Sequence, residues 1–287
     1  MTTTDTFFDM HAAPMRISSV RLKVRDLDAV ASFYTSVLGL AQIGSANGRM
    51  TLGANSVPLL ELVSDPALVP NDRREAGLFH TAFLLPSRAD LARWLAHVAA
   101  GRVPLQGASD HIVSEAIYLA DPEGNGIEVY VDRPTSYWHD PTGAIRMSTD
   151  PLDAQDLLMA AEGTEWAGFP DKGMIGHVHL QVGDTAEADR FYTGILGFDI
   201  ATRYPGASFY GSGGYHHQLA GNAWNSRRAG KRPEGMSGLD AVEIIVRNSS
   251  TLAAITARAE GAGLEIGTGR GGITLHDPWG TAITLKN

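Results

Sequence analysis

The chain has 287 residues, with 23 Lys and Arg against 32 Asp and Glu, so its formal net charge at pH 7 is −9, and it contains no cysteine. Without cysteine, disulfides, thiolate zinc sites, cysteine-bound iron–sulfur clusters and a thiol nucleophile are excluded. Any metal must therefore be bound by histidine, carboxylate or water. The net acidity disfavours nucleic acid or an anionic membrane as the main partner, because both require a concentrated positive surface.

Targeting signals are not apparent in the sequence. No apolar run approaches the roughly 18 residues that a membrane-spanning helix requires. The first residues lack the basic start and long apolar stretch of a secretory signal, and we expect residues 1–15 to form a disordered tail. The sequence thus predicts a cytoplasmic protein without a membrane partner.

An internal repeat is the main organising pattern. Residues 17–26 match residues 175–184, and a Phe-Tyr pair follows each segment at 33–34 and 191–192. The offset between the copies, 175 minus 17, is 158 residues throughout. Matching of this density without a gap indicates two copies of one supersecondary unit.

A second pair of segments has the same order of elements. They begin at Gly77 and Gly238, and each ends with an Asp-Pro-x-Gly turn and a last strand. In all four units an apolar strand is followed by an amphipathic helix and three shorter strands. This pattern predicts an α+β fold of four βαβββ modules, arranged as two cupped half-barrel sheets with helices outside. The modules span residues 16–65, 77–132, 174–224 and 237–287.

The modules group into two domains along the chain. Modules one and two occupy residues 16–132, and modules three and four occupy residues 174–287. The linker between them, 133–173, is too long for a simple turn. We expect it to contain a short helix around residues 151–161.

Three polar residues depart from the apolar strand pattern. His80 and His177 lie on the opening strands of modules two and three, and Glu128 lies in the closing strand of module two. Side chains alternate along a strand, so Glu128 shares a face with Tyr130. A carboxylate there is costly to bury unless a metal or a hydrogen-bond donor neutralises it. Two imidazoles and one carboxylate are the ligands of non-haem Fe(II) oxygenases, which leave coordination positions open.

Considered one at a time, each of these three residues could have a purely structural role instead. A single histidine or glutamate on a strand is usually hydrogen-bonded or faces solvent. His179 shares a face with His177, so either could be the ligand, and spacing does not decide between them. His216 and His217 are adjacent and point to opposite faces, so at most one of them enters a shared site.

The repeated motifs resemble the vicinal oxygen chelate superfamily, which includes glyoxalases, bleomycin-resistance proteins and extradiol dioxygenases. The shared motifs are the His-Val-x-Leu-x-Val-x-Asp opening, the Phe-Tyr and Leu-Gly pairs and the Asp-Pro-x-Gly turn, and they extend over residues 17–285. Segments 84–91, 104–111 and 121–128 are most similar to bacterial catechol 2,3-dioxygenase-like proteins.

The resemblance implies a metal site and a set of catalytic groups. It makes His80, His177 and Glu128 the ligands of Fe(II), for which Mn, Zn or Ni could substitute. It makes His217, in the segment His-His-x-Leu-Ala, the acid–base residue. Tyr118, ten residues before the metal glutamate, is then the second catalytic group.

Two further histidines are assigned to substrate binding. His111 lies in the neighbourhood where such enzymes contact substrate or oxygen, at a shifted spacing. His179 lies beside a predicted ligand and could serve as a neighbouring group instead of a ligand. Each of these assignments requires modules two and three to form one site.

Modules one and four lack the ligand pattern. Ser19 and Ala241 stand where the histidines would be, and Thr284 stands where the glutamate would be, leaving Glu61 as the only acidic counterpart. A full ligand set therefore exists only if module two pairs with module three, which we predict within one chain. A site shared between two chains is the less favoured arrangement.

The expected activity is Fe(II)-dependent extradiol cleavage of catechol or a substituted catechol, with both oxygen atoms of O₂ incorporated, in aromatic hydrocarbon catabolism. The expected partners are a small aromatic diol and O₂, and a homo-oligomer is left open. One alternative is a glyoxalase or isomerase that uses another divalent metal. The other is a non-catalytic protein of the same fold that binds small molecules.

Overall fold

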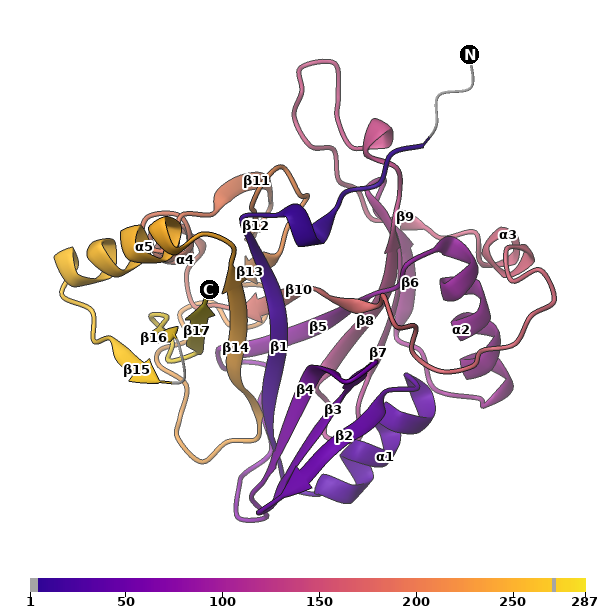
Figure 1. Ribbon diagram of the computed structural model, residues 1–287, viewed down its shortest axis with the longest axis horizontal. Helices are drawn as coiled ribbons and strands as arrows, with labels where there is room; N and C mark the ends of the chain where they lie inside the picture. The colour runs from indigo at the N-terminus through magenta and orange to yellow at the C-terminus, as the bar shows by residue number, and fades with distance from the viewer. Residues whose placement is uncertain (1–4, 270–271) are drawn as a thin grey trace.

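Two β-sheets, each built from two modules, form the frame of the molecule (Figure 1). The computed structural model describes residues 5–269 and 272–287. The first sheet has the strand order β15-β16-β17-β14-β1-β4-β3-β2 and combines modules one and four. Its strands are β1 (Met15–Val24), β2 (Ala41–Ala46), β3 (Arg49–Ala54), β4 (Val57–Ser64), β14 (Gly238–Val246), β15 (Gly267–Gly269), β16 (Gly272–His276) and β17 (Ala282–Lys286).

The second sheet combines modules two and three, which confirms their expected pairing within one chain. Its order is β11-β12-β13-β10-β5-β8-β7-β6-β9, with the antiparallel pair β5 and β10 at its centre. Its strands are β5 (Gly77–Leu84), β6 (Gly107–Asp110), β7 (Ser114–Ala120), β8 (Gly126–Asp132), β9 (Asp150–Pro151), β10 (Met174–Gln181), β11 (Asp199–Tyr204), β12 (Ala207–Gly211) and β13 (Leu219–Asn222).

Four of the helices follow the first strands of the modules. They are α1 (Leu27–Val37), α2 (Arg88–Ala100), α4 (Thr185–Tyr192) and α5 (Ser249–Gly261). The aspartates that end the repeated opening motif cap two of them: Asp26 accepts a hydrogen bond from Ala29 N, and Asp184 accepts one from Glu187 N. These bonds satisfy backbone donors that an α-helix leaves unpaired at its start, which explains the Asp in the motif.

One hydrophobic core joins both sheets and these four helices. In Figure 1, β1 crosses over β10, with α1 and α2 to one side and α4 and α5 to the other. On β5 the alternation of a strand separates the two faces: Phe83 enters the core, whereas Ala82 packs with Tyr130 on the opposite face. That opposite face of the second sheet carries the candidate site.

The central strands β1, β5, β10 and β14 each contain a β-bulge at the equivalent position of their modules. In the β5–β10 pair, Gly176 and Phe79 are the extra residues, each directly before a histidine. In the β1–β14 pair, Ser18 and Asp240 are the extra residues. Such β-bulges re-aim the following side chain. Position 176 requires glycine, because a Cβ there would overlap the Tyr130 hydroxyl.

The linker and the N-terminal segment are only partly as expected. The linker contains α3 (Ala154–Met159), which confirms the short helix predicted there. The expected disorder of residues 1–15 is wrong for their later part, because Phe8 packs on Trp138 and Tyr215, and Met10, in a 3₁₀ helix (Met10–Ala12), is buried. Residues 1–4 lie outside the described residues.

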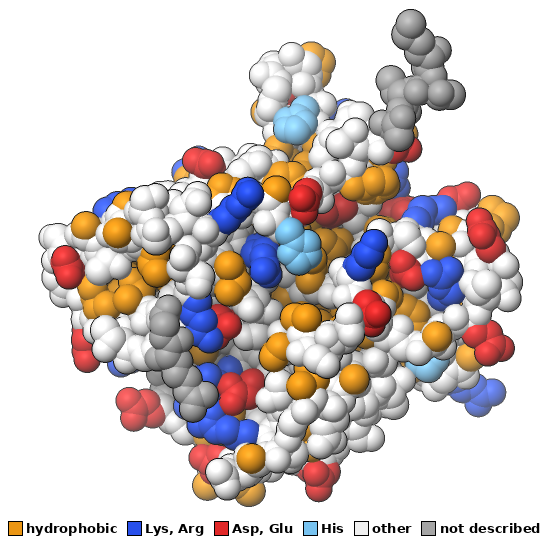
Figure 2. All heavy atoms as spheres, in the orientation of Figure 1, with side chains coloured by type: hydrophobic (Ala, Val, Ile, Leu, Met, Phe, Trp, Pro, Cys, Tyr) orange, Lys and Arg blue, Asp and Glu red, His pale blue; other side chains and the backbone are white. Residues whose placement is uncertain are grey.

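The surface in view (Figure 2) carries charges of both signs, as expected for a chain with a net charge of −9. In Figure 2, Lys and Arg side chains are interspersed with Asp and Glu and with apolar groups on the face in view. Among the helices of the described residues, none is long and apolar enough to cross a membrane.

Candidate active site

His80, Glu128 and His177 meet on the cupped face of the second sheet. The Nε2 atoms of the two histidines are 3.3 Å apart, and Oε2 of Glu128 is 2.9 Å from Nε2 of His80 and 3.2 Å from Nε2 of His177. All three side chains are buried, with between 2% and 6% of each residue exposed. Three potential ligand atoms thus converge on one point.

Strand register explains the convergence. His80 and His177 follow the two bulges of the antiparallel β5–β10 pair, and the parallel pairing of β5 with β8 sets Glu128 beside Ala82. Because Ala82 is two residues after His80, His80 and Glu128 project from the same face. Along the chain His177 is 97 residues from His80 and 49 residues from Glu128, so only the sheet brings the three side chains together.

The ionisation states suit a divalent metal. Burial lowers the pKa of His177 to about 4, although Glu128 acts in the opposite direction, so its imidazole is neutral near pH 7. Burial alone would raise the pKa of the Glu128 carboxyl, but His177 and His80 hold it well below its usual range. Neutral imidazole and ionised carboxylate are the forms that bind metal ions. The three residues therefore fit a divalent cation.

The same register identifies the equivalent positions elsewhere in the fold. In the first sheet, Arg21 pairs with Glu61 as Ala82 pairs with Glu128, so Glu61 is the counterpart of the glutamate. Its carboxylate is bonded to Arg21 and Arg49 instead. In module three, the pairing of His179 with Ala220 puts an alanine at the glutamate position. The quasi-symmetric arrangement therefore has three residues with potential ligand atoms and a fourth position, Ala220, without one.

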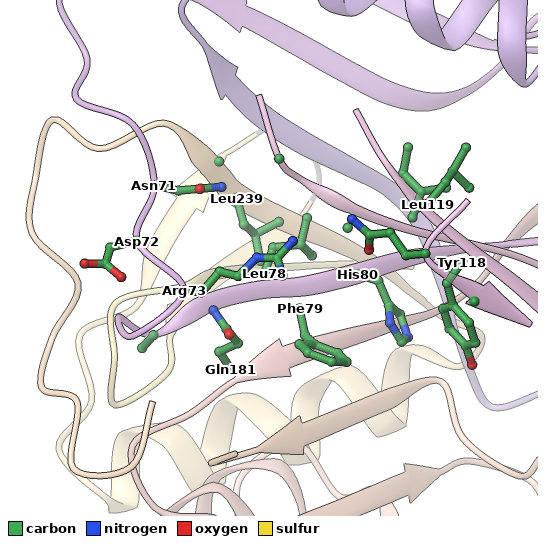
Figure 3. A pocket seen from close by; sticks show the side chains of 18 of the residues that line it. Asn71, Asp72, Arg73, Leu78, Phe79, His80, Tyr118, Leu119, Gln181 and Leu239 are labelled. Atoms are coloured by element: carbon green, nitrogen blue, oxygen red, sulfur yellow. The ribbon is translucent and has the colours of Figure 1, made fainter. Parts of the chain in front are cut away.

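A cavity of about 280 Å³ opens over the three residues. Beyond the His–Glu–His cluster its wall is largely aromatic and apolar, with Phe79, Phe209, Trp224, Tyr204 and Met147. A second cavity, of about 380 Å³, shares Phe79, His80, Ser109 and Tyr118 with it. Figure 3 shows His80 and Tyr118 side by side at one end of that second cavity, and Asn71 and Asp72 at the other.

His217 and Tyr118 also line the first cavity. The ring of His217 lies 4.1 Å, centroid to centroid, from that of His177, and the ring of Tyr118 lies 5.6 Å from that of His80. Burial, together with the neighbouring histidines, lowers the pKa of His217 well below its usual value. Burial and Glu128 raise the pKa of Tyr118 well above 10. A neutral imidazole and a neutral phenol thus face one space.

The two histidines assigned to substrate binding occupy different parts of this cavity. His111 donates a 2.6 Å hydrogen bond from Nδ1 to the Ser148 carbonyl, and its Nε2 lies 2.5 Å from the Tyr118 hydroxyl oxygen. His179 bonds the Asn222 amide through Nε2 at 3.0 Å, and its ring centroid is 4.9 Å from that of His80. The three-residue cluster with ligand atoms mutually within 4.8 Å contains His177 and not His179.

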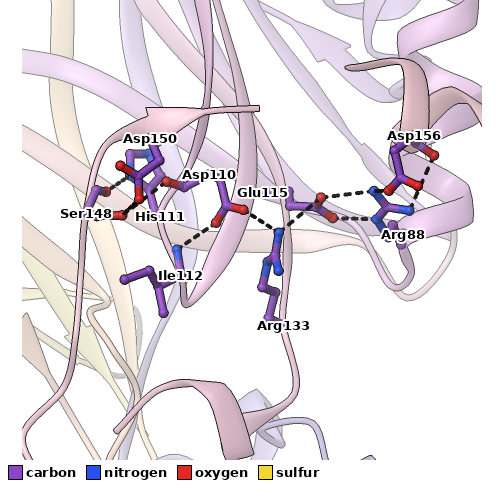
Figure 4. A network of polar contacts seen from close by, with 9 residues as sticks. All are labelled: Arg88, Asp110, His111, Ile112, Glu115, Arg133, Ser148, Asp150 and Asp156. Atoms are coloured by element: carbon purple, nitrogen blue, oxygen red, sulfur yellow. Dashed lines mark hydrogen bonds and ion pairs between the residues drawn. The ribbon is translucent and has the colours of Figure 1, made fainter. Parts of the chain in front are cut away.

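The linker closes one side of the cavity. Met147, Ser148 and Thr149 belong to its lining. Polar contacts hold the linker against module two (Figure 4): Arg88 bridges Glu115 and Asp156, Arg133 bonds Asp110, and His111 bonds the Ser148 carbonyl. The linker is therefore part of the site and more than a connection.

Sequence reasoning missed several of these residues. Phe79 gave no signal of a cavity wall, because a bulge decides where it points. For Trp224, in segment 223–227, the sequence left open a place at the pocket border or a structural turn with a packed indole, and Trp224 lines the cavity. The linker segment 147–149 carried no motif.

The sequence matches the model of a protein family over most of its length. The model of the Glyoxalase/Bleomycin resistance protein/Dioxygenase superfamily matches residues 16–129 and 174–285. The chain belongs to this superfamily.

Two dioxygenases are similar to this chain in sequence. The chain is 37% identical over 267 residues to a catechol-2,3-dioxygenase of Bacillus subtilis (strain 168), covering 91% of this chain and 93% of that protein. It is 27% identical over 166 residues to biphenyl-2,3-diol 1,2-dioxygenase 2 of Rhodococcus globerulus, covering 53% of this chain and 85% of that protein. These relatives support a dioxygenase-like enzyme that uses a metal and a small-molecule substrate.

Solved structures share the fold at low sequence identity. A dioxygenase from Bacillus subtilis subsp. subtilis str. 168 matches with a TM-score of 0.64 at 14% identity, covering 94% of this chain and 84% of that chain. Glyoxalase I from Zea mays matches with a TM-score of 0.58, also at 14% identity, covering 94% and 92%. The expected fold class is confirmed.

Proposed function

We propose that this protein is an Fe(II)-dependent extradiol dioxygenase that cleaves catechol or a substituted catechol with O₂. One observation carries the proposal: a His–Glu–His cluster with one ligand-free quasi-symmetric position lies in the same cavity as a buried, uncharged histidine. The 37% identity to a catechol-2,3-dioxygenase over most of both chains supports it. A role in aromatic catabolism in the cytoplasm is part of the proposal.

His80, His177 and Glu128 would hold the metal. Fe(II) in this position would supply the redox chemistry that O₂ requires and would lower the pKa of substrate hydroxyls. The protein supplies binding, orientation and proton transfer. Mn, Zn or Ni would fit the same three ligand atoms, since all accept imidazole nitrogen.

His217 would take and return the substrate proton. It faces the cavity next to His177 and is uncharged, so it can accept a hydroxyl proton as a general base. Positioned proton transfer of this kind contributes roughly 10²–10⁴-fold to rate. The Tyr118 hydroxyl would donate its hydrogen bond to His111 and accept one from the substrate through its oxygen.

The aromatic wall favours an uncharged ring with apolar substituents. Phe79, Phe209 and Trp224 would pack against the substrate and exclude water. Arg203, which also lines the cavity, is bonded to Asp189 at 3.0 Å, so its charge is already partnered. A carboxylated catechol would have to compete for that arginine.

The glyoxalase alternative is less well supported. Ala220 offers no carboxylate at the fourth quasi-symmetric position, so a base or ligand from that strand is missing. That alternative also leaves His217 without a function. A purely binding protein would not require the convergence of three ligand atoms.

Anaerobic loading with Fe(II), followed by catechol and then O₂, tests the proposal. A yellow ring-opened semialdehyde and consumption of one O₂ per catechol are expected. The Glu128→Ala variant should give neither. Turnover of a hemithioacetal with Ni²⁺ or Zn²⁺, but no product from catechol with Fe(II), would instead establish the glyoxalase alternative. Binding of catechol without turnover under any metal would indicate a binding protein.

A further inference from the structure

A buried chain of hydrogen bonds leads away from His217, on the side opposite the cavity. His217 Nδ1 lies 2.8 Å from His216 Nδ1, and His216 Nε2 lies 2.9 Å from Asp132 Oδ1. His216 has 0% of its surface exposed, so these partners are not exchanged with water. Neither His216 nor Asp132 has a part in the function proposed above.

The positions of the hydrogens follow from the end of the chain. A carboxylate only accepts, so His216 Nε2 carries a hydrogen and donates it to Asp132. In the hydrogen pattern without an added proton on His216, its Nδ1 has no hydrogen and accepts. His217 Nδ1 must therefore donate, and neutral His217 keeps a free lone pair on Nε2, the ring nitrogen outside this chain of bonds.

We propose that Asp132 and His216 are positioning residues that fix His217 in the tautomer with an unprotonated Nε2, so that His217 serves as the base of the site. This inference rests on the proposed function, because the base acts on the bound diol. In the proton transfer, the substrate O–H bond breaks, an N–H bond forms at Nε2, and the electron pair stays on the substrate oxygen. The resulting imidazolium faces Asp132 through His216, and the Asp132 carboxylate stabilises the charge.

Two buried aromatic residues surround this chain of hydrogen bonds. Tyr215 donates a second hydrogen bond to Asp132 Oδ1 at 3.1 Å, and its own oxygen lies 2.7 Å from the Tyr130 hydroxyl. Trp138 packs against His216 with ring centroids 4.9 Å apart. A rotation of the His216 ring would break both of its hydrogen bonds inside the core, where unpaired polar groups are costly. The two bonds therefore fix the orientation of the His216 ring.

Two readouts test the assignment, and one of them needs no activity. ¹⁵N NMR of histidine-labelled, metal-free protein reports which ring nitrogen carries hydrogen, and loss of a signal in His217→Gln assigns the residue. We expect His217 to be protonated on Nδ1 in the wild type. In His216→Phe, which keeps the ring volume, we expect a shift toward the Nε2–H tautomer.

Kinetics give the second readout. With Fe(II) bound, His216→Phe should lower kcat on catechol on the order of 10²-fold, while KM and iron content stay within about threefold of wild type. Asp132→Asn keeps an oxygen acceptor and should be milder than Asp132→Leu. Tyr215→Phe is the matched control, because it removes a buried bond to the same oxygen but leaves the path to His217 complete, so it should retain the tautomer.

The outcomes separate the two proposals. Protonation of wild-type His217 on Nε2, or an unchanged tautomer and kcat in His216→Phe, would overturn the positioning role. A loss of kcat in His216→Phe that only follows loss of iron would assign it a structural role and would also overturn it. If wild-type protein cleaves no catechol, the proposed function fails, and the NMR result still decides the tautomer.

Discussion

Tyr192 donates a 2.8 Å hydrogen bond to Asp277, and this contact joins module three to module four. Tyr192 ends α4, whereas Asp277 lies in the turn before β17, 85 residues later. Tyr34 and Asp121 make the equivalent, longer contact of 3.5 Å between modules one and two. The Phe-Tyr and Asp-Pro-x-Gly motifs therefore meet in space, which gives both motifs a structural reason.

Tyr192→Phe should destabilise the protein. The substitution leaves the buried Asp277 Oδ2 without this donor, which costs about 1–3 kcal/mol. The midpoint of urea unfolding measures the change. Tyr34→Phe should cost less, because its bond is longer. Tyr204→Phe, at an exposed position, is the control, and an equal loss there would contradict a specific role of the contact.

Ionisation of Asp277 should lower stability as the pH rises. Burial raises the pKa of this carboxyl despite the hydrogen bond from Tyr192. The native state then holds the proton more tightly than the unfolded state, so the free energy of unfolding falls as the pH rises from the ordinary aspartate pKa through the raised one. Asp277→Asn removes this dependence. The free energy of unfolding of the variant minus that of the wild type should therefore increase over that range and then level off. A constant value would show that Asp277 does not titrate in this way.

Metal binding should depend on Glu128 and not on its counterpart. Glu128→Ala removes one of three converging ligand atoms, so the metal content of purified protein and its activity should fall together, with the metal affinity reduced at least tenfold. Elemental analysis and dialysis against Fe(II) measure this. Glu61→Ala is the matched control, because Glu61 holds the same register position in the first sheet but pairs with arginines. Metal loss in Glu61→Ala alone would assign the metal to the first sheet instead.

Tyr118→Phe should separate catalysis from metal binding. The variant loses the hydroxyl that bonds His111 and faces the cavity, but it keeps the ring beside His80. We expect a normal iron content and a kcat lowered about tenfold or more. Stopped-flow measurement of product formation and metal analysis of the same sample test this. Unchanged turnover would remove Tyr118 from the catalytic groups.

The site was predictable from the sequence to the extent that the repeat carried it. His80, His177 and Glu128 could be selected because they depart from the apolar strand pattern and open or close matched modules. The pairing of modules two and three followed from the requirement that the ligands meet. Whether His177 or His179 enters the cluster could not be decided, because both lie on the same face and only the bulge at Gly176 determines which of them reaches Glu128.

The sequence by itself determined the four modules, their strands and helices and the residues able to bind a metal, because strand alternation, helix periodicity and capping are local and repeat with a constant offset. Only the tertiary structure decided that Phe79, Trp224 and residues 147–149 enclose the cavity, and that Asp132 supports His217 through His216. These contacts join segments far apart in the chain. They depend on strand register and loop packing, which no local pattern encodes.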